Sequence, residues 1–236
     1  MIRTVAETGS TNADLLDAVR AGERVGEGVW LVADRQSAGR GRQGRTWFDG
    51  FGNFMGSTVV RPGPHDPPAP TLALLAGLSL YEAVVPLLAD PSVLSLKWPN
   101  DLLVGRAKLA GILLEREGDA VIVGIGVNLA RAPEVEGRDT IALSAFGPAP
   151  DRDSFAQALS ASFDRELDRW RTVGIEPLLR RWQAASHPPG SPLSIHEPGG
   201  NVVSGTFAGL AEDGSLLLRL EDGTTRPIHA GDVMLG

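Results

Sequence analysis

Two lysines, Lys97 and Lys108, are the first residues of this 236-residue chain whose type and spacing suggest chemistry. The chain has 22 Lys and Arg residues, and the other 20 are all arginine. Both lysines lie in one short stretch, which begins with Lys97-Trp-Pro-Asn-Asp101. A lysine offers a compact, strongly hydrated point charge on a flexible stem, which the planar guanidinium of arginine does not. The stretch is therefore the first candidate for a charged site, and its alternative is a solvated loop.

A second cluster lies upstream, where Gln36-Ser-Ala precedes Gly39-Arg-Gly-Arg-Gln-Gly44 and then Arg45-Thr-Trp47. Its glycines match the spacing G-x-G-x-x-G of a dinucleotide-binding turn. That turn opens directly into a helix, whereas Arg45-Thr-Trp-Phe-Asp-Gly50 is no helix start. Arginines interleaved with glycines instead favour a basic loop that closes over phosphates or carboxylates with side chains and backbone N–H groups. A solvated glycine loop is the other interpretation.

Three further polar groups have a structural and a functional interpretation. Ser10-Thr11-Asn12 precedes a helical pattern, so Ser10 or Thr11 is expected as a helix N-cap, or as a hydrogen-bonding group toward a polar ligand ring. The Pro99-Asn-Asp101 sequence is good turn chemistry, yet a cation beside amide and carboxylate groups also suits a nucleotide with its Mg²⁺. Gly124 and Gly126 either relieve crowding in a strand or let a ligand approach the backbone.

Composition narrows the function classes. The net charge of −7 and the pI near 5.1 argue against broad electrostatic binding to nucleic acid or to anionic membranes. The chain has no cysteine, which excludes disulfides, a thiolate nucleophile and sulfur-ligated metals. No H-E-x-x-H, G-x-S-x-G or P-loop pattern is present. Without a signal peptide after Met1, the expected location is the cytoplasm.

Hydrophobic periodicity predicts a mixed α/β domain over residues 1–186, with a mixed sheet backed by helices. A helix is expected after Ser10, a buried one over 71–88, an amphipathic one along 155–170, and a last one opened by Pro177. The strand-like runs are residues 2–6, 29–33, 54–60, 93–96, 109–114 and 121–127.

Beyond this domain the composition changes. The sequence His187-Pro-Pro-Gly-Ser-Pro192 is typical of a linker. Turn signals at Pro198-Gly-Gly-Asn201, Glu212-Asp-Gly214 and Glu221-Asp-Gly223 separate short alternating runs. Residues 187–236 are therefore predicted to form a small all-β domain.

Five motifs, in this order, closely resemble the bacterial biotin protein ligases. They are Ser-Thr-Asn at 10–12, Gly-Arg-Gly-Arg-Gln-Gly-Arg-Thr-Trp at 39–47, Lys-Trp-Pro-Asn-Asp at 97–101, Lys-Leu-Ala-Gly-Ile-Leu at 108–113 and Gly-Ile-Gly-Val-Asn at 124–128. The resemblance spans nearly the whole chain. It implies a class II synthetase-like catalytic domain followed by a small SH3-like β-barrel. No helix-turn-helix precedes residue 1, so the chain is expected to be of the non-regulatory kind.

The resemblance implies a two-step reaction. Biotin and MgATP give biotinyl-5′-AMP and pyrophosphate, and a lysine of a biotin carboxyl carrier protein, such as that of acetyl-CoA carboxylase, then takes the biotinyl group. Lys108 and Arg40 are the implied catalytic residues, and the Mg²⁺ comes with ATP, with no metal ligand assigned. The implied biotin-binding residues are Ser10, Thr11, Asn12, Gln36, Gly39, Arg40, Gly41, Arg42, Trp47, Lys108, Gly111, Gly124 and Gly126. The implied nucleotide-binding residues are Arg42, Arg45, Trp47, Lys97, Asn100, Asp101 and Asn128.

Two alternatives stay beside this hypothesis. A lipoate protein ligase shares the fold and the adenylation chemistry, but its family carries Arg-Arg and Gly-Gly-Gly at the lipoate loop, where this chain has the sequence at 39–47. A non-catalytic sensor of biotin or nucleotide is the other, against which the two lysines argue. The expected partner is the carrier protein, with neither nucleic acid nor membrane, and the chain is expected to be a monomer or a homodimer.

Overall fold

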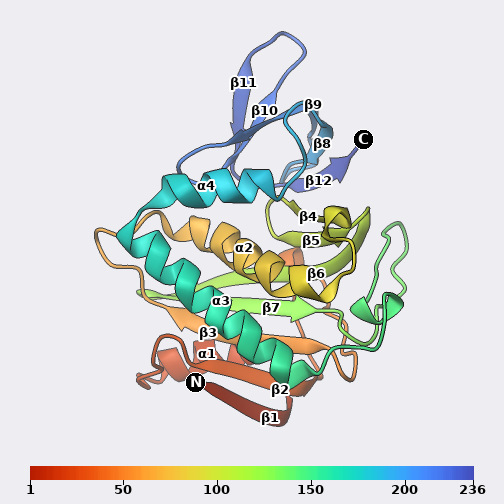
Figure 1. Ribbon diagram of the computed structural model, residues 1–236. Coiled ribbons are helices and arrows are strands. Elements are labelled where there is room, and N and C mark those ends of the chain that lie inside the picture. Colours follow the sequence, from red (N-terminus) through yellow and green to blue (C-terminus); the bar gives the residue numbers. More distant parts are fainter.

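The computed structural model describes all 236 residues and places a seven-stranded sheet with helices on both faces beside a smaller five-stranded sheet (Figure 1). The strand order of the large sheet is β1-β2-β3-β7-β6-β5-β4. Only β1 and β2 are parallel neighbours, so the sheet is mixed as predicted. Its strands are β1 (Ile2–Thr8), β2 (Trp30–Gln36), β3 (Phe54–Val60), β4 (Leu94–Lys97), β5 (Asp101–Val104), β6 (Ala107–Glu117) and β7 (Ala120–Val127).

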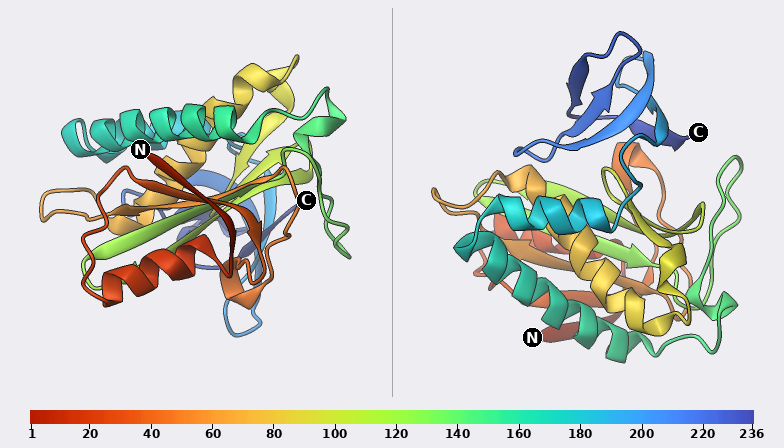
Figure 2. Two further views of the ribbon diagram at one scale, coloured as in Figure 1. Left: turned by 90° about the horizontal axis from the view of Figure 1, so that it is seen from below. Right: turned by 45° about the horizontal axis from the view of Figure 1, so that its top comes forward.

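The helices divide between the two faces of this sheet, as the left view of Figure 2 shows. Helix α1 (Thr11–Arg20) covers one face, where Leu15 and Leu16 pack with Val59 and Ile122. The other face carries α2 (Leu72–Val84), α3 (Arg152–Thr172) and α4 (Ile175–Ala184). Helix α1 alone covers the first face, so the polar residues at its start lie close to the sheet and to any ligand bound there.

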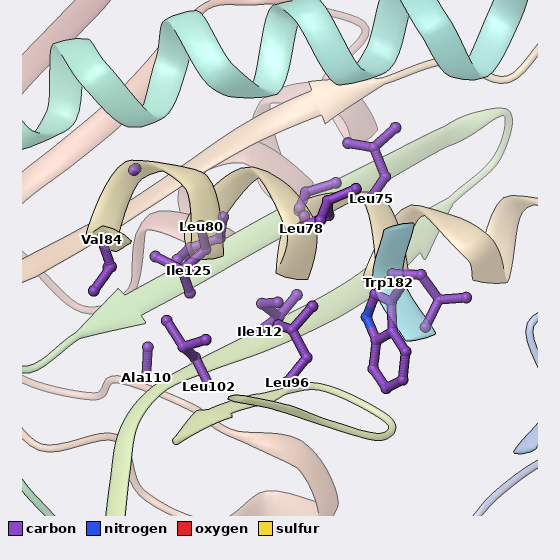
Figure 3. Packing of buried hydrophobic residues seen from close by; sticks show 14 of the residues in the cluster. Leu75, Leu78, Leu80, Val84, Leu96, Leu102, Ala110, Ile112, Ile125 and Trp182 are labelled. Carbon is purple, nitrogen blue, oxygen red and sulfur yellow. The ribbon is translucent and has the colours of Figure 1, made fainter. Parts of the chain in front are cut away.

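Helix α2 forms the centre of the main core. Its side chains are apolar on almost every side, because the helix packs against the sheet, α3 and α4 and is buried by all three. In Figure 3, Leu80 lies beside Ile125 of β7, whereas Leu75 points to the opposite side of the helix. The helix predicted over 71–88 ends earlier, at Val84, and continues as a 3-10 turn over Val85–Leu87, where Pro86 lacks the N–H of a further helical turn.

The segment Ala69–Leu87 is long and apolar enough to cross a membrane by length and composition, but 61% of it is buried inside this fold. It is therefore the core helix that the sequence predicts. On the same face of the sheet as α2, α3 is fixed through aromatic contacts, since the rings of Phe163 and Trp30 meet edge to face at 5.4 Å.

The small sheet follows α4 and has the strand order β11-β10-β9-β8-β12. Its strands are β8 (Pro192–His196), β9 (Val202–Leu210), β10 (Leu216–Arg219), β11 (Thr225–Ile228) and β12 (Asp232–Leu235). The three predicted turns join β8 to β9, β9 to β10 and β10 to β11. The domain boundary predicted between 186 and 187 falls between α4 and β8, and a partly buried hydrogen bond from Trp98 Nε1 to Gly214 O (2.9 Å) ties the two parts together.

Two further elements differ from the sequence prediction. The turn predicted around Pro99-Asn-Asp101 is present, but Asp101 already begins β5, which the sequence did not reveal because only three residues follow it before the next turn. The last helix begins at Ile175, two residues before Pro177, after Gly174 with φ 88°. Glycine takes this left-handed backbone at little cost, so the chain reverses there.

Candidate functional site

A cavity of about 770 Å³ brings together nearly all residues that the five motifs single out. It lies where β2, β3, β6 and β7 pass the start of α1, and it is closed by the glycine-rich loop and by β12. Its volume suits one or two small ligands. The predicted residues on its wall are Ser10, Thr11, Asn12, Gln36, Arg40, Gly41, Arg42, Arg45, Trp47, Lys97, Asn100, Asp101, Lys108, Gly111, Gly124, Gly126 and Asn128.

Gly39 is the one predicted residue that does not line the cavity. It lies behind the wall, where a Cβ atom would come within 3.1 Å of the Trp47 carbonyl and 3.2 Å of Gln36 Nε2. The Trp47 N–H donates to the Gly39 carbonyl (2.9 Å), which closes the base of the glycine-rich loop. Gly39 therefore shapes the loop through close packing and does not face the cavity.

One end of the cavity has a floor of neutral hydrogen-bonding groups. The N–H of Thr11 donates to Gln36 Oε1 (2.7 Å), and the Thr11 hydroxyl lies 2.7 Å from Ser57 Oγ. Ser57 Oγ donates to Asn12 Oδ1 (2.6 Å), so the Thr11 hydroxyl directs its single proton to Ser57 Oγ or to Gln36 Oε1 (3.1 Å). Thr11 thus keeps a lone pair for a ligand N–H group.

The groups left over on this floor point to a polar ligand. Ser10 stands at the N-cap position of α1, as predicted, but its side chain makes no capping hydrogen bond and only 4% of the residue is exposed. Gln36 accepts with Oε1 and has its amide N–H groups free. The floor therefore offers both donors and acceptors to a ligand. Burying one of these groups without a hydrogen-bond partner would cost about 1–3 kcal/mol.

The middle of the cavity holds a cationic centre. Asp101 lies between the two lysines, with Oδ1 2.6 Å from Lys108 Nζ and Oδ2 3.5 Å from Lys97 Nζ. Burial lowers the pKa of Lys97, and the Asp101 carboxylate acts in the opposite direction. A register shift between β5 and β6, after Leu102, sets Leu103 opposite Lys108. Such bulges re-aim a side chain beside a site, which explains how Lys108 reaches the carboxylate.

The glycine-rich loop supplies further cations. Arg42 is half-buried and donates to Asn100 Oδ1 (3.1 Å), and burial lowers its pKa. The exposed side chain of Arg40 makes no hydrogen bond or ion pair within the protein, although its backbone bridges to Thr46. A loop with one anchored and one free guanidinium is suited to an anionic ligand.

Trp47 closes the cavity against two glycines. A Cβ atom on Gly126 would lie 2.2 Å from the indole Cε2, and one on Gly111 would lie 3.1 Å from Cζ3. The Lys108 ammonium stands 5.8 Å from the ring centroid, within cation–π range. Gly124 leaves room for the Asn12 side chain in the same way, because Asn12 Oδ1 would be 2.2 Å from an added Cβ. In this structure, side chains make the close approaches that these glycines permit.

Two buried polar atoms of the cavity have no partner in the protein. They are the Asn128 side-chain oxygen, an acceptor, and the Trp47 indole N–H, a donor. Asn128 is only 2% exposed and its amide N–H donates to the Ile141 carbonyl (3.2 Å), so the free oxygen has a fixed direction. Buried polar atoms nearly always have a hydrogen-bond partner, so these two atoms without one indicate a ligand.

Sequence reasoning missed several residues of the wall. Ser57 lies in a fully buried strand, and the polar pair Ser57-Thr58 within an apolar run was the signal available. Asp232 on β12 gave no such signal. Its carboxylate pairs with Arg45 and lies 3.7 Å from Arg138, so the C-terminal domain holds the glycine-rich loop. Burial raises the pKa of Asp232, but the guanidinium groups around it outweigh this and hold the pKa below its ordinary value.

Comparison with known families gives the class that this fold and cavity define. Residues 9–129 match the biotin/lipoate A/B protein ligase family, and residues 193–236 match the biotin protein ligase C-terminal domain. The chain belongs to the biotin/lipoate A/B protein ligase family. It is 37% identical over 237 residues to the biotin–acetyl-CoA-carboxylase ligase of Mycobacterium tuberculosis, which covers 98% of this chain and 87% of that one. The family resemblance predicted from the five motifs is confirmed.

Two further relatives agree. The biotin–acetyl-CoA-carboxylase ligase of Paracoccus denitrificans is 37% identical over 243 residues, covering 98% of this chain and 99% of that one. The structure of the biotin protein ligase from Aquifex aeolicus in complex with biotin and ATP superposes with a TM-score of 0.86 at 28% identity, covering 100% of this chain and 98% of that one. The predicted catalytic fold and the small β domain after it are both confirmed.

Proposed function

We propose that this protein is an ATP-dependent biotin ligase, which attaches biotin through biotinyl-5′-AMP to one lysine of a biotin carboxyl carrier domain. One observation carries the proposal: a neutral polar floor and a cationic centre share a single cavity. The first suits an uncharged heterocycle, and the second suits the meeting of two anions. The two curated relatives are biotin–acetyl-CoA-carboxylase ligases, and the Aquifex aeolicus structure holds biotin and ATP, which supports both substrates.

The polar floor favours biotin over lipoate. The cyclic urea of biotin has two N–H donors and one carbonyl acceptor, which can pair with the Thr11 and Ser10 hydroxyls and with the free N–H groups of Gln36. The dithiolane ring of lipoate has no such groups. It would leave the floor unpaired, and each unpaired buried group costs about 1–3 kcal/mol. Because the Thr11 hydroxyl directs its proton to Ser57 or to Gln36 Oε1, it presents lone pairs to the ligand and so prefers a donor.

In the first step an oxygen of the biotin carboxylate attacks the α-phosphorus of ATP, and pyrophosphate leaves with the electron pair of the broken P–O bond. The carboxylate and the phosphate repel each other, so the site must hold and neutralise both. Lys108 does this as the main charge stabiliser, and Arg40 joins it from the loop. Such groups act by positioning and electrostatic stabilisation, without proton transfer.

The nucleotide occupies the other end of the cavity. The free oxygen of Asn128 suits the exocyclic amine of adenine, and Trp47 offers a ring for stacking or shields the site. Lys97, Arg42 and Arg45 face the phosphates, while Asn100 and Asp101 hold two of these cations in place. Mg²⁺ enters with the phosphates of ATP.

In the second step the carrier amine attacks the carbonyl carbon of the mixed anhydride, and AMP leaves. A mixed anhydride hydrolyses if water reaches it, so a closed loop over the intermediate favours transfer. Arg40, Arg42 and Arg45 give the glycine-rich loop three cations, and Arg40, which has no partner within the protein, gains one when the adenylate forms. We therefore expect this loop to become more ordered with the adenylate bound.

The protein partner that accepts the biotinyl group is a carrier domain of acetyl-CoA carboxylase or another biotin-dependent enzyme. We propose that the reaction takes place in the cytoplasm, where ATP and carboxylases meet, that the protein works as a monomer or a homodimer, and that it binds neither nucleic acid nor membranes. The net charge of −7 supports the last point.

Pyrophosphate release tests this proposal against a lipoate ligase and a non-catalytic sensor. The purified protein is incubated with radiolabelled ATP, Mg²⁺ and either biotin or lipoate. A biotin ligase releases pyrophosphate with biotin only. Release with lipoate only would identify the rival ligase, and binding of both ligands without any release would identify a sensor.

A further inference from the structure

All ε-amines of this chain lie inside the proposed active site. Lys97 and Lys108 are the only lysines, they line the cavity, and their side chains are 20% and 25% exposed. Every other basic residue besides the histidines is an arginine. A guanidinium stays protonated at any working pH and is therefore no acyl acceptor. The outer surface of the enzyme thus presents no lysine to an acylating agent.

This distribution matters because of the intermediate, and the inference rests on the proposed function. A neutral amine attacks the carbonyl carbon of biotinyl-5′-AMP, a C–N bond forms, the C–O bond to phosphate breaks, and AMP leaves with that electron pair. The nitrogen then releases a proton to solvent. A lysine of the enzyme reacts in the same way as a carrier lysine if it is near and unprotonated. The two cavity lysines are near.

One carboxylate holds both of them. Asp101 Oδ1 accepts a hydrogen bond from Lys108 Nζ at 2.6 Å, and Oδ2 faces Lys97 Nζ at 3.5 Å. Asp101 is itself only 12% exposed and sits opposite Lys97 across β4 and β5. An opposite charge at this distance favours the ammonium form, which has no lone pair for attack.

We propose that Asp101 protects the enzyme from its own intermediate, by keeping Lys97 and Lys108 as ammonium ions that stabilise the mixed anhydride and do not attack it. Asp101 thereby separates two functions of an amine in one cavity: the enzyme's lysines act as charges, and the carrier lysine acts as the nucleophile. The arginine-only surface extends the same protection to adenylate that escapes from the site.

The surroundings of Lys97 show why the protection is needed. Burial lowers its pKa, and the neighbouring cations Lys108 and Arg138 lower it further. Asp101 is the charged group that acts against them. His187 also faces Lys97, and burial lowers the pKa of that imidazole, which favours its neutral form and so leaves no charge there to hold the ammonium. Without Asp101, every remaining influence on Lys97 favours the reactive neutral amine.

Competitive acetylation tests the role of Asp101 without any biotin chemistry. Wild type, Asp101→Asn and Asp101→Glu are treated with trace acetic anhydride from pH 6 to 10, and labelling of each amine is followed by peptide mass spectrometry. The exposed α-amine of Met1 serves as the internal reference, and Asp17→Asn, which removes a surface partner of Arg20, is the matched control. Thermal melting checks that each variant is folded.

We expect Asp101→Asn to acetylate at Lys97 at least tenfold faster than wild type near pH 8, because each unit by which a pKa falls raises the neutral fraction tenfold. Asp101→Glu and Asp17→Asn should behave as wild type. Equal Lys97 labelling in wild type and Asp101→Asn would overturn the proposal.

The second experiment supplies synthetic biotinyl-5′-AMP, so that a slow first step does not matter. Wild type should gain a biotinyl group on neither lysine, whereas Asp101→Asn should gain one on Lys97. Labelling of a lysine in wild type, or of neither in the variant, would overturn the proposal. Transfer from the adenylate to a carrier domain is measured in the same tubes. A failure of wild type there would contradict the proposed function, while the acetylation result still reports on Asp101.

Discussion

Replacing Gly126 by alanine perturbs the site through one methyl group. The new Cβ would lie 2.2, 2.5 and 2.5 Å from three atoms of the Trp47 indole, whereas ordinary carbon contacts begin near 3.4 Å. The indole must therefore move by about 1 Å, which also takes it from its place beneath the Lys108 ammonium. A displacement of about 1 Å near the reacting groups can lower a rate roughly a hundredfold, and the lost cation–π contact adds about 0.5–1 kcal/mol.

The assay is the rate of biotin-dependent pyrophosphate release at saturating ATP, together with the melting temperature. Gly26→Ala is the matched control, because its Cβ would meet Val29 at an ordinary 3.5 Å and lies outside the cavity wall. We expect a fall of about a hundredfold for Gly126→Ala and no change for the control. An unchanged rate for a folded Gly126→Ala protein would refute the placement of Trp47 against Gly126 in the working enzyme.

Four further predictions follow from the same site and core. Lys108→Ala should slow adenylate formation a hundredfold or more, since one preorganised charge stabiliser contributes ~2.7–4 kcal/mol, and Lys108→Arg should recover only part; near-normal pyrophosphate release would remove Lys108 from catalysis. Arg42→Gly should loosen retention of the adenylate more than it slows synthesis, so an unrelated lysine-rich protein becomes labelled; equal labelling at matched synthesis rates would contradict this. Phe163→Ala should cost about 3–5 kcal/mol of unfolding free energy by urea titration, because the ring is fully buried against Trp30; a cost below about 1 kcal/mol would mean that the site repacks. The stabilising effect of Asp232 should be complete above the ordinary carboxyl pKa of about 3.9 and lost as pH falls through its lower folded value, so the melting temperatures of wild type and Asp232→Asn should converge in acid; a constant difference down to pH 2 would contradict it.

The sequence predicted the residues of the site better than their contacts. The ordered motifs identified almost every polar residue of the cavity wall, since chemistry restricts residue type at each of those positions. Asp101 shows the limit. Its type and position were evident from Lys97-Trp-Pro-Asn-Asp101, but its place between both lysines depends on the pairing of β4 with β5 and of β5 with β6, which no local pattern encodes.

Long-range contacts account for the remaining differences. Ser57 joins the polar floor from a strand that is buried throughout, and Asp232 reaches the glycine-rich loop from the other domain, 187 residues further along the chain than Arg45. The prediction of where each element ends was limited by short-range effects. One example is the continuation of α2 as a 3-10 turn at Pro86. Turn chemistry in the C-terminal domain was the easier case, because Gly and Asp at fixed places dictate the backbone there.

Transfer of biotin to a single carrier lysine tests the central claim most directly. The purified protein is mixed with MgATP, a biotin carboxyl carrier domain and either biotin or lipoate, and the intact carrier is weighed by mass spectrometry beside a variant in which the target lysine is replaced by arginine. The proposed function predicts one added biotinyl group on the wild-type carrier, none on the variant, and none with lipoate. A carrier that gains lipoate but not biotin, or gains neither while the enzyme is folded and binds both substrates, would contradict it.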